Sequence, residues 1–191
     1  MHMMKKLSVL AACLALIACQ DNGPGTVAPA GNPVEAKPAA AAPKASNAAV
    51  TGSKEQPQLL IETFDGKTFD LSSHRGKWVV VNFWATWCAP CLKEIPDFNA
   101  LAKKRGDIQF IGLAYEEIER PDLEAFLKRH PIDYPIAVLN VYDPPKDFDT
   151  PRGLPMTVLI GPEGKRVKQF LGPVTSVELE AEMAKAGAQD Q

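Results

Sequence analysis

The sequence predicts a single α/β domain that begins near residue 58, in which strands and helices alternate and a final hairpin and helix close the fold. Two observations carry this prediction. Short apolar runs rich in β-branched and aromatic residues alternate with segments of helical periodicity. The 191 residues, 46% of them hydrophobic, are enough for one domain with its own core. The 23 acidic and 21 basic side chains nearly balance, so charge gives no reason to expect nucleic-acid binding.

The strands are predicted from apolar runs and turn signals. The expected elements are a hairpin of strands 59–64 and 67–71, strand 78–84, helix 90–104, strand 108–115, helix 121–129, strand 135–139, a hairpin of strands 156–160 and 166–171, and a last helix to Lys185. Asp65-Gly66 is a strong signal for a two-residue turn in the first hairpin. The run WVVVNFW at 78–84 is typical of a central strand buried on both faces.

Proline and hydroxyl side chains mark the helices. Pro90 is tolerated in the first turn of the helix over 90–104, whereas Pro96 is expected to bend it. Thr175 or Ser176 is the expected N-cap of the last helix. The domain therefore spans 58–187 and leaves a short tail, 188–191.

Residues 1–18 predict an export signal. The apolar run 7–18 follows two lysines and would span only about 18 Å as a helix, short of a ~30 Å hydrocarbon core. Leu16-Ile17-Ala18-Cys19 resembles the bacterial lipobox, in which the signal is cut before a cysteine that carries lipid. Leu16 is too large for the −3 position of an ordinary cleavage site. We therefore expect lipidation at Cys19; an ordinary secreted protein with an accidental cysteine is the alternative.

Residues 19–57 are expected to be a tether. After Cys19 this segment has no aromatic residue and no Leu, Ile or Met, and it is dominated by Ala, Pro and Gly. Such a composition cannot bury enough apolar surface to offset the entropy of ordering. We therefore predict a disordered linker between the lipidated cysteine and the domain, which would span about 35 Å as a flexible coil.

Cys88 and Cys91 are the two cysteines left in the domain, and they form a C-x-x-C at a strand-to-helix junction. A helix N-terminus offers unpaired amides and a partial positive charge, both of which stabilise a thiolate. Cys91 continues into the apolar stripe of the helix, so we expect it to be buried and Cys88 to lie at an exposed tip. Cys88 would attack a substrate disulfide, and Cys91 would resolve the mixed disulfide.

The sequence argues against three other interpretations of the C-x-x-C. A structural disulfide usually closes a longer loop. A zinc site needs further ligands, and His74 and His130 have no paired spacing. A thiol peroxidase requires Pro and Ser/Thr seven and three residues before the cysteine, where this chain has Val81 and Ala85. Dithiol redox chemistry is favoured over all three.

Residues 58–186 resemble the thioredoxin superfamily, and specifically the TlpA/ResA/CcmG group of membrane-tethered thioredoxin-like proteins. The matching stretches are VVVNFWATWCAPCLKEIP (79–96) and GLPMTVLIGPEGKRV (153–167). The resemblance implies a thioredoxin fold, with a central mixed sheet flanked by helices and an N-terminal β-hairpin extension. It also implies that Pro155 is a cis-proline facing the C-x-x-C, and that the backbone around Leu154 pairs with an incoming peptide.

Four more residues near the C-x-x-C are assigned roles. Asn82 stands where thioredoxin has a buried Asp, and the resemblance places it in the TlpA-like group. Glu94 matches the group's C-x-x-C-x-x-E signature, which implies that it tunes the thiols and relays a proton. The alternative for Glu94 is an exposed carboxylate paired with a lysine such as Lys93 or Lys103. Trp84 is expected in the core and Trp87 in an apolar collar around Cys88 that contacts substrate.

The expected function is an extracytoplasmic thiol–disulfide oxidoreductase that reduces protein disulfides, in cytochrome c maturation or a related process. The resemblance implies a membrane electron donor of the DsbD/CcdA type, and we expect a monomer with no cofactor and no metal. A disulfide-forming oxidase and a non-catalytic lipoprotein with a structural disulfide are the alternatives. Gln20 after the lipidated cysteine favours the outer membrane, whereas such a donor lies in the inner one, so the choice of membrane stays open.

Overall fold

The computed structural model describes residues 52–189, and all element bounds below refer to this part of the chain. The predicted signal segment, Cys19 and the tether up to residue 51 lie outside the described residues. Within the described part, no helix combines the length and the apolar character that crossing a bilayer requires.

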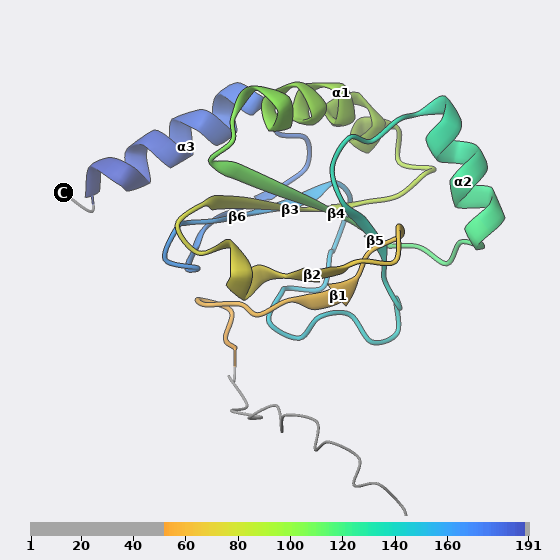
Figure 1. Ribbon diagram of the computed structural model, residues 1–191, viewed down its shortest axis with the longest axis horizontal. Coiled ribbons are helices and arrows are strands. Elements are labelled where there is room, and N and C mark those ends of the chain that lie inside the picture. Colours follow the sequence, from red (N-terminus) through yellow and green to blue (C-terminus); the bar gives the residue numbers. More distant parts are fainter. Residues whose placement is uncertain (1–51, 190–191) are drawn as a thin grey trace, which may run out of the picture. The chain divides into compact units, whose positions relative to one another are not determined.

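A five-stranded mixed sheet forms the centre of the domain (Figure 1). Its strand order is β5 (Ile136–Val138), β4 (Ile108–Ala114), β3 (Trp78–Trp84), β6 (Met156–Ile160) and β7 (Arg166–Leu171). The first three run parallel to one another, and β6 and β7 are antiparallel to their neighbours. The prediction of a central mixed sheet is confirmed. β3 and β4 lie inside the sheet with nearly every residue buried, as their continuous apolar sequences indicate.

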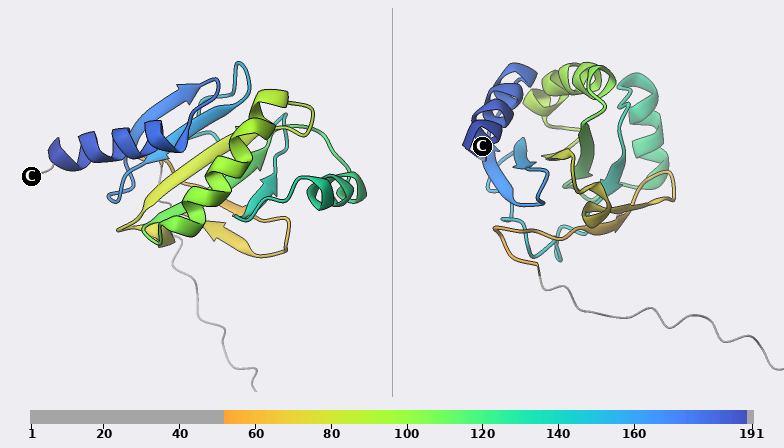
Figure 2. Two further views of the ribbon diagram at one scale, coloured as in Figure 1. Left: turned by 90° about the horizontal axis from the view of Figure 1, so that it is seen from above. Right: turned by 60° about the vertical axis from the view of Figure 1, so that its left-hand side comes forward.

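Three helices cover one face of this sheet: α1 (Ala89–Lys104), α2 (Arg120–Arg129) and α3 (Ser176–Gln189) (Figure 2). Their buried side chains join those of β3 and β4 in one hydrophobic cluster. α1 contributes the stripe Cys91, Ile95 and Phe98, as its helical periodicity predicts. α3 continues four residues past Lys185, so the helix is longer than expected.

The N-terminal hairpin covers the opposite face (Figure 1). It comprises β1 (Leu60–Glu62) and β2 (Thr68–Asp70), which form a separate two-stranded antiparallel sheet. A short 3-10 helix, η1 (Leu71–His74), follows directly and was not predicted. The alternation along β3 explains both layers, because odd-numbered residues from Val79 to Phe83 face this hairpin while Val80 and Trp84 face the helices.

The turn of this hairpin differs from the prediction. Asp65-Gly66 does not form a two-residue turn. The last paired strand residues are Glu62 and Thr68, and the Thr63 amide donates to the Lys67 carbonyl at 2.7 Å, which leaves residues 64–66 as the turn. The Gly66 amide donates to the Thr63 carbonyl at 2.8 Å, and Gly66 has the positive φ of 79° that glycine tolerates. The Phe64 amide donates to the Ile136 carbonyl of β5 at 2.7 Å. Phe64 therefore bonds to the main sheet rather than to the partner strand of the hairpin.

Residues 53–57, which the composition places in the tether, contact the domain. The Glu55 carbonyl accepts a hydrogen bond of 2.8 Å from the Arg166 amide at the start of the edge strand β7. Lys54 forms an ion pair with Asp149, and Pro57 is buried. These contacts include one with the edge strand of the sheet. Contacts of the domain therefore extend to residues before Gln58.

Candidate functional site: a redox disulfide at a helix N-terminus

Cys88 and Cys91 form a disulfide at the start of α1. β3 ends at Trp84, a short turn follows in which the Cys88 amide donates to the Ala85 carbonyl, and α1 begins at Ala89. Cys88 is the N-cap of α1, and its Sγ accepts a hydrogen bond of 3.3 Å from the Cys91 amide. The predicted placement at a helix N-terminus is confirmed. An amide already directed at Cys88 Sγ is the interaction that stabilises a thiolate there.

The prediction that Cys88 lies at an exposed tip is wrong for the disulfide form. Cys88 is 4% exposed and Cys91 is 1% exposed. Cys88 belongs to the same hydrophobic cluster as Trp84 and Ala85, and its bond to the inner cysteine holds its sulfur against that cluster. It is still the more accessible of the two sulfur-bearing residues, because it precedes the helix while Cys91 lies on the inner stripe.

The Leu154–Pro155 peptide bond is cis, as the resemblance implies. Pro155 is buried and directly precedes β6, whose first residue, Met156, pairs with Phe83 near the end of β3. The two strands are antiparallel, so the Pro155 loop and the segment leading to Cys88 leave the sheet at the same end. Leu154 is half-buried and contacts the clusters on both faces of the sheet. The sheet register thus brings together two motifs that lie more than 60 residues apart in the sequence.

Glu94 is buried on α1, one turn after Cys91. Its Oε1 accepts a hydrogen bond of 2.5 Å from the Val174 amide, while Oε2 accepts none from the described residues. Burial raises the pKa of Glu94 to about 7, and the Val174 amide and the nearby Asn82 side chain oppose that rise. The alternative of an exposed Glu94 paired with a lysine is wrong, because Glu94 is 5% exposed. Lys103 forms an ion pair with Asp133 instead.

Asn82 is buried under α1, where the sequence comparison with thioredoxin places it. Its Nδ2 donates to Thr157 Oγ1 at 3.0 Å, and the two residues are direct partners in the β3–β6 register. Asn82 therefore supplies a neutral polar contact beneath Glu94. Asn82 carries no titrating proton, whereas Glu94, one turn after Cys91 on α1, does.

The tryptophans on either side of the site differ sharply in exposure. Trp84 is fully buried and packs against Phe126 of α2, with ring centroids 5.8 Å apart. Trp87 is 69% exposed, immediately before Cys88. The placement of Trp84 in the core agrees with the sequence-based interpretation, whereas the collar of Trp87 around Cys88 stays a prediction. An exposed indole beside a reactive sulfur is a suitable contact for an apolar group of another molecule.

Sequence reasoning missed Glu116, which holds the segment between β3 and α1. Its Oε1 accepts a hydrogen bond of 2.6 Å from the Thr86 amide, and its Oε2 accepts one of 2.9 Å from Thr86 Oγ1. Glu116 follows the end of β4, which runs parallel to β3, so both residues lie at the same edge of the sheet. The sequence signal that could have identified Glu116 is its position, a carboxylate two residues after a buried strand that runs parallel to β3.

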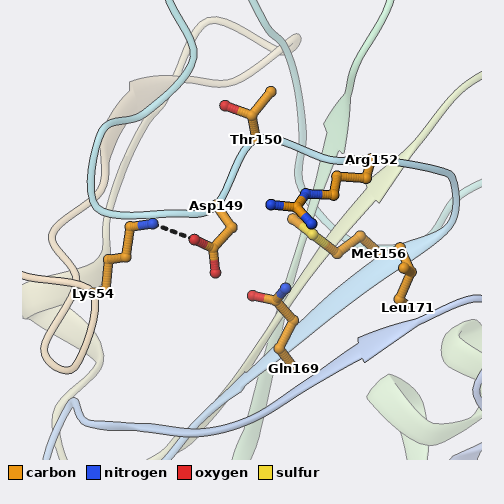
Figure 3. Close-up of a pocket in the computed structure, with 7 residues that line it drawn as sticks. All are labelled: Lys54, Asp149, Thr150, Arg152, Met156, Gln169 and Leu171. Atoms are coloured by element: carbon orange, nitrogen blue, oxygen red, sulfur yellow. Dashed lines mark hydrogen bonds and ion pairs between the residues drawn. The ribbon is translucent and has the colours of Figure 1, made fainter.

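A cleft of about 510 Å³ lies on the hairpin side of the sheet, between the N-terminal segment, the loop before β6, and β7 (Figure 3). Its lining includes Lys54 and Asp149, which form an ion pair, and Arg152 on the loop that leads to Pro155. Neither cysteine lines it. Among the described residues, no group of three or more His, Cys, Asp and Glu side chains is placed to hold a metal ion.

Comparisons with known proteins agree with this geometry. The profile of the AhpC/TSA family matches residues 53–169. The thiol-disulfide oxidoreductase ResA of Bacillus anthracis is 32% identical over 137 residues, which cover 69% of this chain and 76% of that protein.

Solved structures are similar over the same region. A thiol:disulfide interchange protein of the thioredoxin family from Chlorobium tepidum TLS has a TM-score of 0.58 and 27% identity, covering 73% of this chain and 99% of that one. The pneumococcal exposed lipoprotein thioredoxin from Streptococcus pneumoniae strain TIGR4 has a TM-score of 0.57 and 28% identity, covering 67% and 98%. With a disulfide-bonded C-x-x-C at a helix N-terminus and a cis-proline at the same end of the sheet, the chain belongs to the AhpC/TSA family and is a ResA-like thiol–disulfide oxidoreductase of the thioredoxin fold.

Proposed function

We propose that this oxidoreductase acts outside the cytoplasm as a reductant of protein disulfides, and that Cys88 and Cys91 carry the electrons. The observation that supports this most directly is the disulfide itself, in which both cysteines are buried but a helix amide is directed at Cys88 Sγ while Cys91 lies on the inner stripe of α1. That asymmetry suits an attacking thiol at Cys88 and a resolving thiol at Cys91.

The reaction proceeds in two exchanges. The Cys88 thiolate attacks one sulfur of a substrate disulfide, which breaks the substrate S–S bond and releases a thiolate that takes up a proton. The Cys91 thiolate then attacks Cys88 Sγ, releases the second substrate thiolate and forms the Cys88–Cys91 disulfide. Two electrons pass from the dithiol to the substrate. A donor dithiol must return them, and we propose a membrane protein of the DsbD/CcdA type for this step.

Glu94 is the proposed proton acceptor for Cys91. It lies one turn away on the same helix, it is buried, and its pKa of about 7 is well matched to a proton transfer at neutral pH. When Cys91 is reduced, a carboxylate at this position can take its proton before the second exchange. Pro155, Leu154 and Trp87 are proposed to border the substrate, because the first two leave the sheet beside the site and the third is exposed next to Cys88.

Trapping of the mixed disulfide tests the proposed roles of the cysteines. In Cys91→Ser the first exchange occurs but the second cannot, so a disulfide-bonded adduct with a model protein disulfide accumulates through Cys88. Cys88→Ser is the matched control, and it should trap at least tenfold less because Cys91 is covered. The adduct is measured on non-reducing gels and by mass. Absence of an adduct in Cys91→Ser would instead indicate a static disulfide.

The direction of electron flow is tested by the midpoint potential of the Cys88–Cys91 couple. A reductant should have a potential near −270 mV or below, whereas an oxidase should lie near −120 mV. The potential is measured by equilibration with glutathione or dithiothreitol buffers. A value at the oxidising end would replace the reductant with the disulfide-forming alternative.

Lipidation of Cys19 is the proposed means of membrane attachment. The support is the Leu16–Cys19 motif, together with the similarity to the pneumococcal exposed lipoprotein thioredoxin. Cys19→Ala should abolish incorporation of labelled fatty acid and should move the protein from the membrane fraction to the soluble fraction. Unchanged labelling in this variant would contradict the proposal.

A further inference from the structure

Asp97 lies one turn after Glu94 on α1 and contacts the start of α3. Its Oδ2 accepts a hydrogen bond of 2.6 Å from the Ser176 amide, and its Oδ1 accepts one of 2.9 Å from Ser176 Oγ. Glu94 accepts the Val174 amide at 2.5 Å. Two carboxylates of α1 therefore hold two amides of one short segment, residues 172–176, which connects β7 to α3.

α3 has a separate N-terminal cap that does not involve α1. Glu178 Oε2 accepts hydrogen bonds of 2.8 Å from both the amide and the hydroxyl of Thr175, and Thr175 Oγ1 accepts one of 3.2 Å from the Glu178 amide. This reciprocal arrangement is a capping box. The Asp97 contacts are thus additional to local capping, and what they add is a link between the two helices.

The segment 172–176 also borders the redox site. The Gly172 amide donates to the Pro155 carbonyl at 2.9 Å, and Gly172 has a φ of 92°, which favours glycine. Pro173 and Val174 lie across a hollow of about 270 Å³ from Pro90, Glu94 and Asp97. One short segment is therefore fixed to the Pro155 loop at one end and to α1 at the other.

We propose that Asp97 is a positioning residue for the redox reaction: by holding Ser176, it keeps the Val174 amide on Glu94 and keeps residues 172–175 beside the Pro155 loop. The inference rests on the proposed function, because the Val174–Glu94 contact matters to the reaction only if Glu94 accepts the proton of Cys91. The contact itself can be measured whether or not the protein is a reductase.

The charge of Asp97 and its contact with Ser176 can be separated by substitution. A neighbouring negative charge can only disfavour ionisation of a carboxyl group, so removing the charge alone cannot raise the pKa of Glu94. The Val174 hydrogen bond favours ionisation, so its loss raises that pKa. The other polar groups around Glu94 stay unchanged in the variants below; they are Asn82 on β3, Cys91 and Lys93 on α1, and the buried Tyr134 before β5.

The test is an NMR pH titration of the Glu94 carboxyl carbon in the oxidised full-length chain in detergent. In this form Cys88 and Cys91 are joined in the disulfide and do not titrate. Loss of the signal in Glu94→Gln assigns it. In Asp97→Ala we expect the midpoint to rise by about one pH unit, the size of one lost hydrogen bond to a charged group. Asp97→Asn removes the charge but can still bond Ser176, so its midpoint should stay unchanged or fall.

Glu178→Ala is the matched control. It removes a carboxylate from the same helix N-terminus but breaks no contact with α1. It should lower the midpoint of thermal unfolding as Asp97→Ala does, yet leave the pH midpoint of the Glu94 titration unchanged. Should Asp97→Ala fail to fold, Ser176→Ala carries the test, because it removes one of the two contacts and should give a smaller upward shift.

The outcomes separate the two proposals. A lower Glu94 titration midpoint in both Asp97 variants would mean that Asp97 acts only through its charge. Equal upward shifts of that midpoint in Asp97→Ala and Glu178→Ala would mean that Asp97 acts only by stabilising α3. Either result overturns the inference. No shift at all overturns it as well. Failure of the reductant proposal would appear in the trapping experiment and would leave these titrations untouched.

Discussion

Glu94 and Glu178 both lie in helices, but the structure gives them opposite chemistry. Burial raises the pKa of Glu94, whereas hydrogen bonds from Thr175 at the surface lower the pKa of Glu178. Both side chains accept a backbone amide, so the difference comes from desolvation rather than from the hydrogen bonds. At the scale of one residue, the environment decides whether a carboxyl group is a poised acid or a helix cap.

The raised pKa of Glu94 predicts how stability depends on pH. The folded pKa is about 7 and the ordinary value is 4.5, so between them the folded state binds a proton that the unfolded state has lost. Stability of the oxidised protein should therefore fall as the pH rises from about 5 to about 7. Glu94→Gln should remove this decrease, as measured by urea unfolding at both pH values.

The comparison with Glu94→Gln is needed because other groups titrate in the same range. Burial lowers the pKa of His74, which gives a stability change of the opposite sign, since the unfolded state then binds the extra proton. This contribution is present in both proteins and cancels in the difference. Parallel pH profiles for the wild type and Glu94→Gln would show that Glu94 titrates normally.

At the scale of elements, the segment between β3 and α1 depends on a neighbouring strand. Thr86 is the residue before Trp87, and its amide and its hydroxyl both donate to Glu116 after β4. The side chain that holds this active-site segment thus comes from the loop that follows the adjacent parallel strand. The C-x-x-C motif alone contains no information about this contact.

Replacement of Glu116 by Ala should destabilise the protein by about 2 kcal/mol, because a charged acceptor of two hydrogen bonds is lost and Thr86 is left without partners. Glu116→Gln should lose less, since its amide can both accept from the Thr86 backbone and donate to the hydroxyl. Glu117→Ala is the matched control and should change stability by less than about 0.5 kcal/mol, because Glu117 is exposed. Chemical denaturation measures all three. Equal losses at positions 116 and 117 would contradict a specific role for the Glu116 contact.

At the scale of the whole molecule, residues 53–57 belong to the domain in structure, although their composition is that of a linker. They contact β7, the loop before β6 and the turn at Glu163. A chain beginning at Gln58 should be less stable than one beginning at Gly52 by roughly 2 kcal/mol, since it loses a backbone hydrogen bond, an ion pair and the burial of Pro57. Thermal unfolding of the two chains compares them directly. Identical unfolding midpoints would show that residues 53–57 do not stabilise the domain.

The sequence by itself determined the order of the main strands and helices, the position of the C-x-x-C at a helix start, and the cis-proline by resemblance. These features follow from local patterns: the continuous apolar run of β3, the helical stripe through Cys91, and the motifs around Pro155. Each depends on the chemistry of residues that are close together in the chain.

Only the tertiary structure decided the burial of Cys88, the wide turn at Asp65-Gly66, and the contacts made by Glu116 and Asp97. These depend on residues that are far apart in the sequence: Phe64 bonds to Ile136, Thr86 to Glu116, and Asp97 to Ser176. Hydrophobic periodicity specifies which face of an element is buried, but not which polar group meets it. That pairing is set by sheet register and helix packing, and here it sets the surroundings of the buried Glu94 on the helix that carries Cys91.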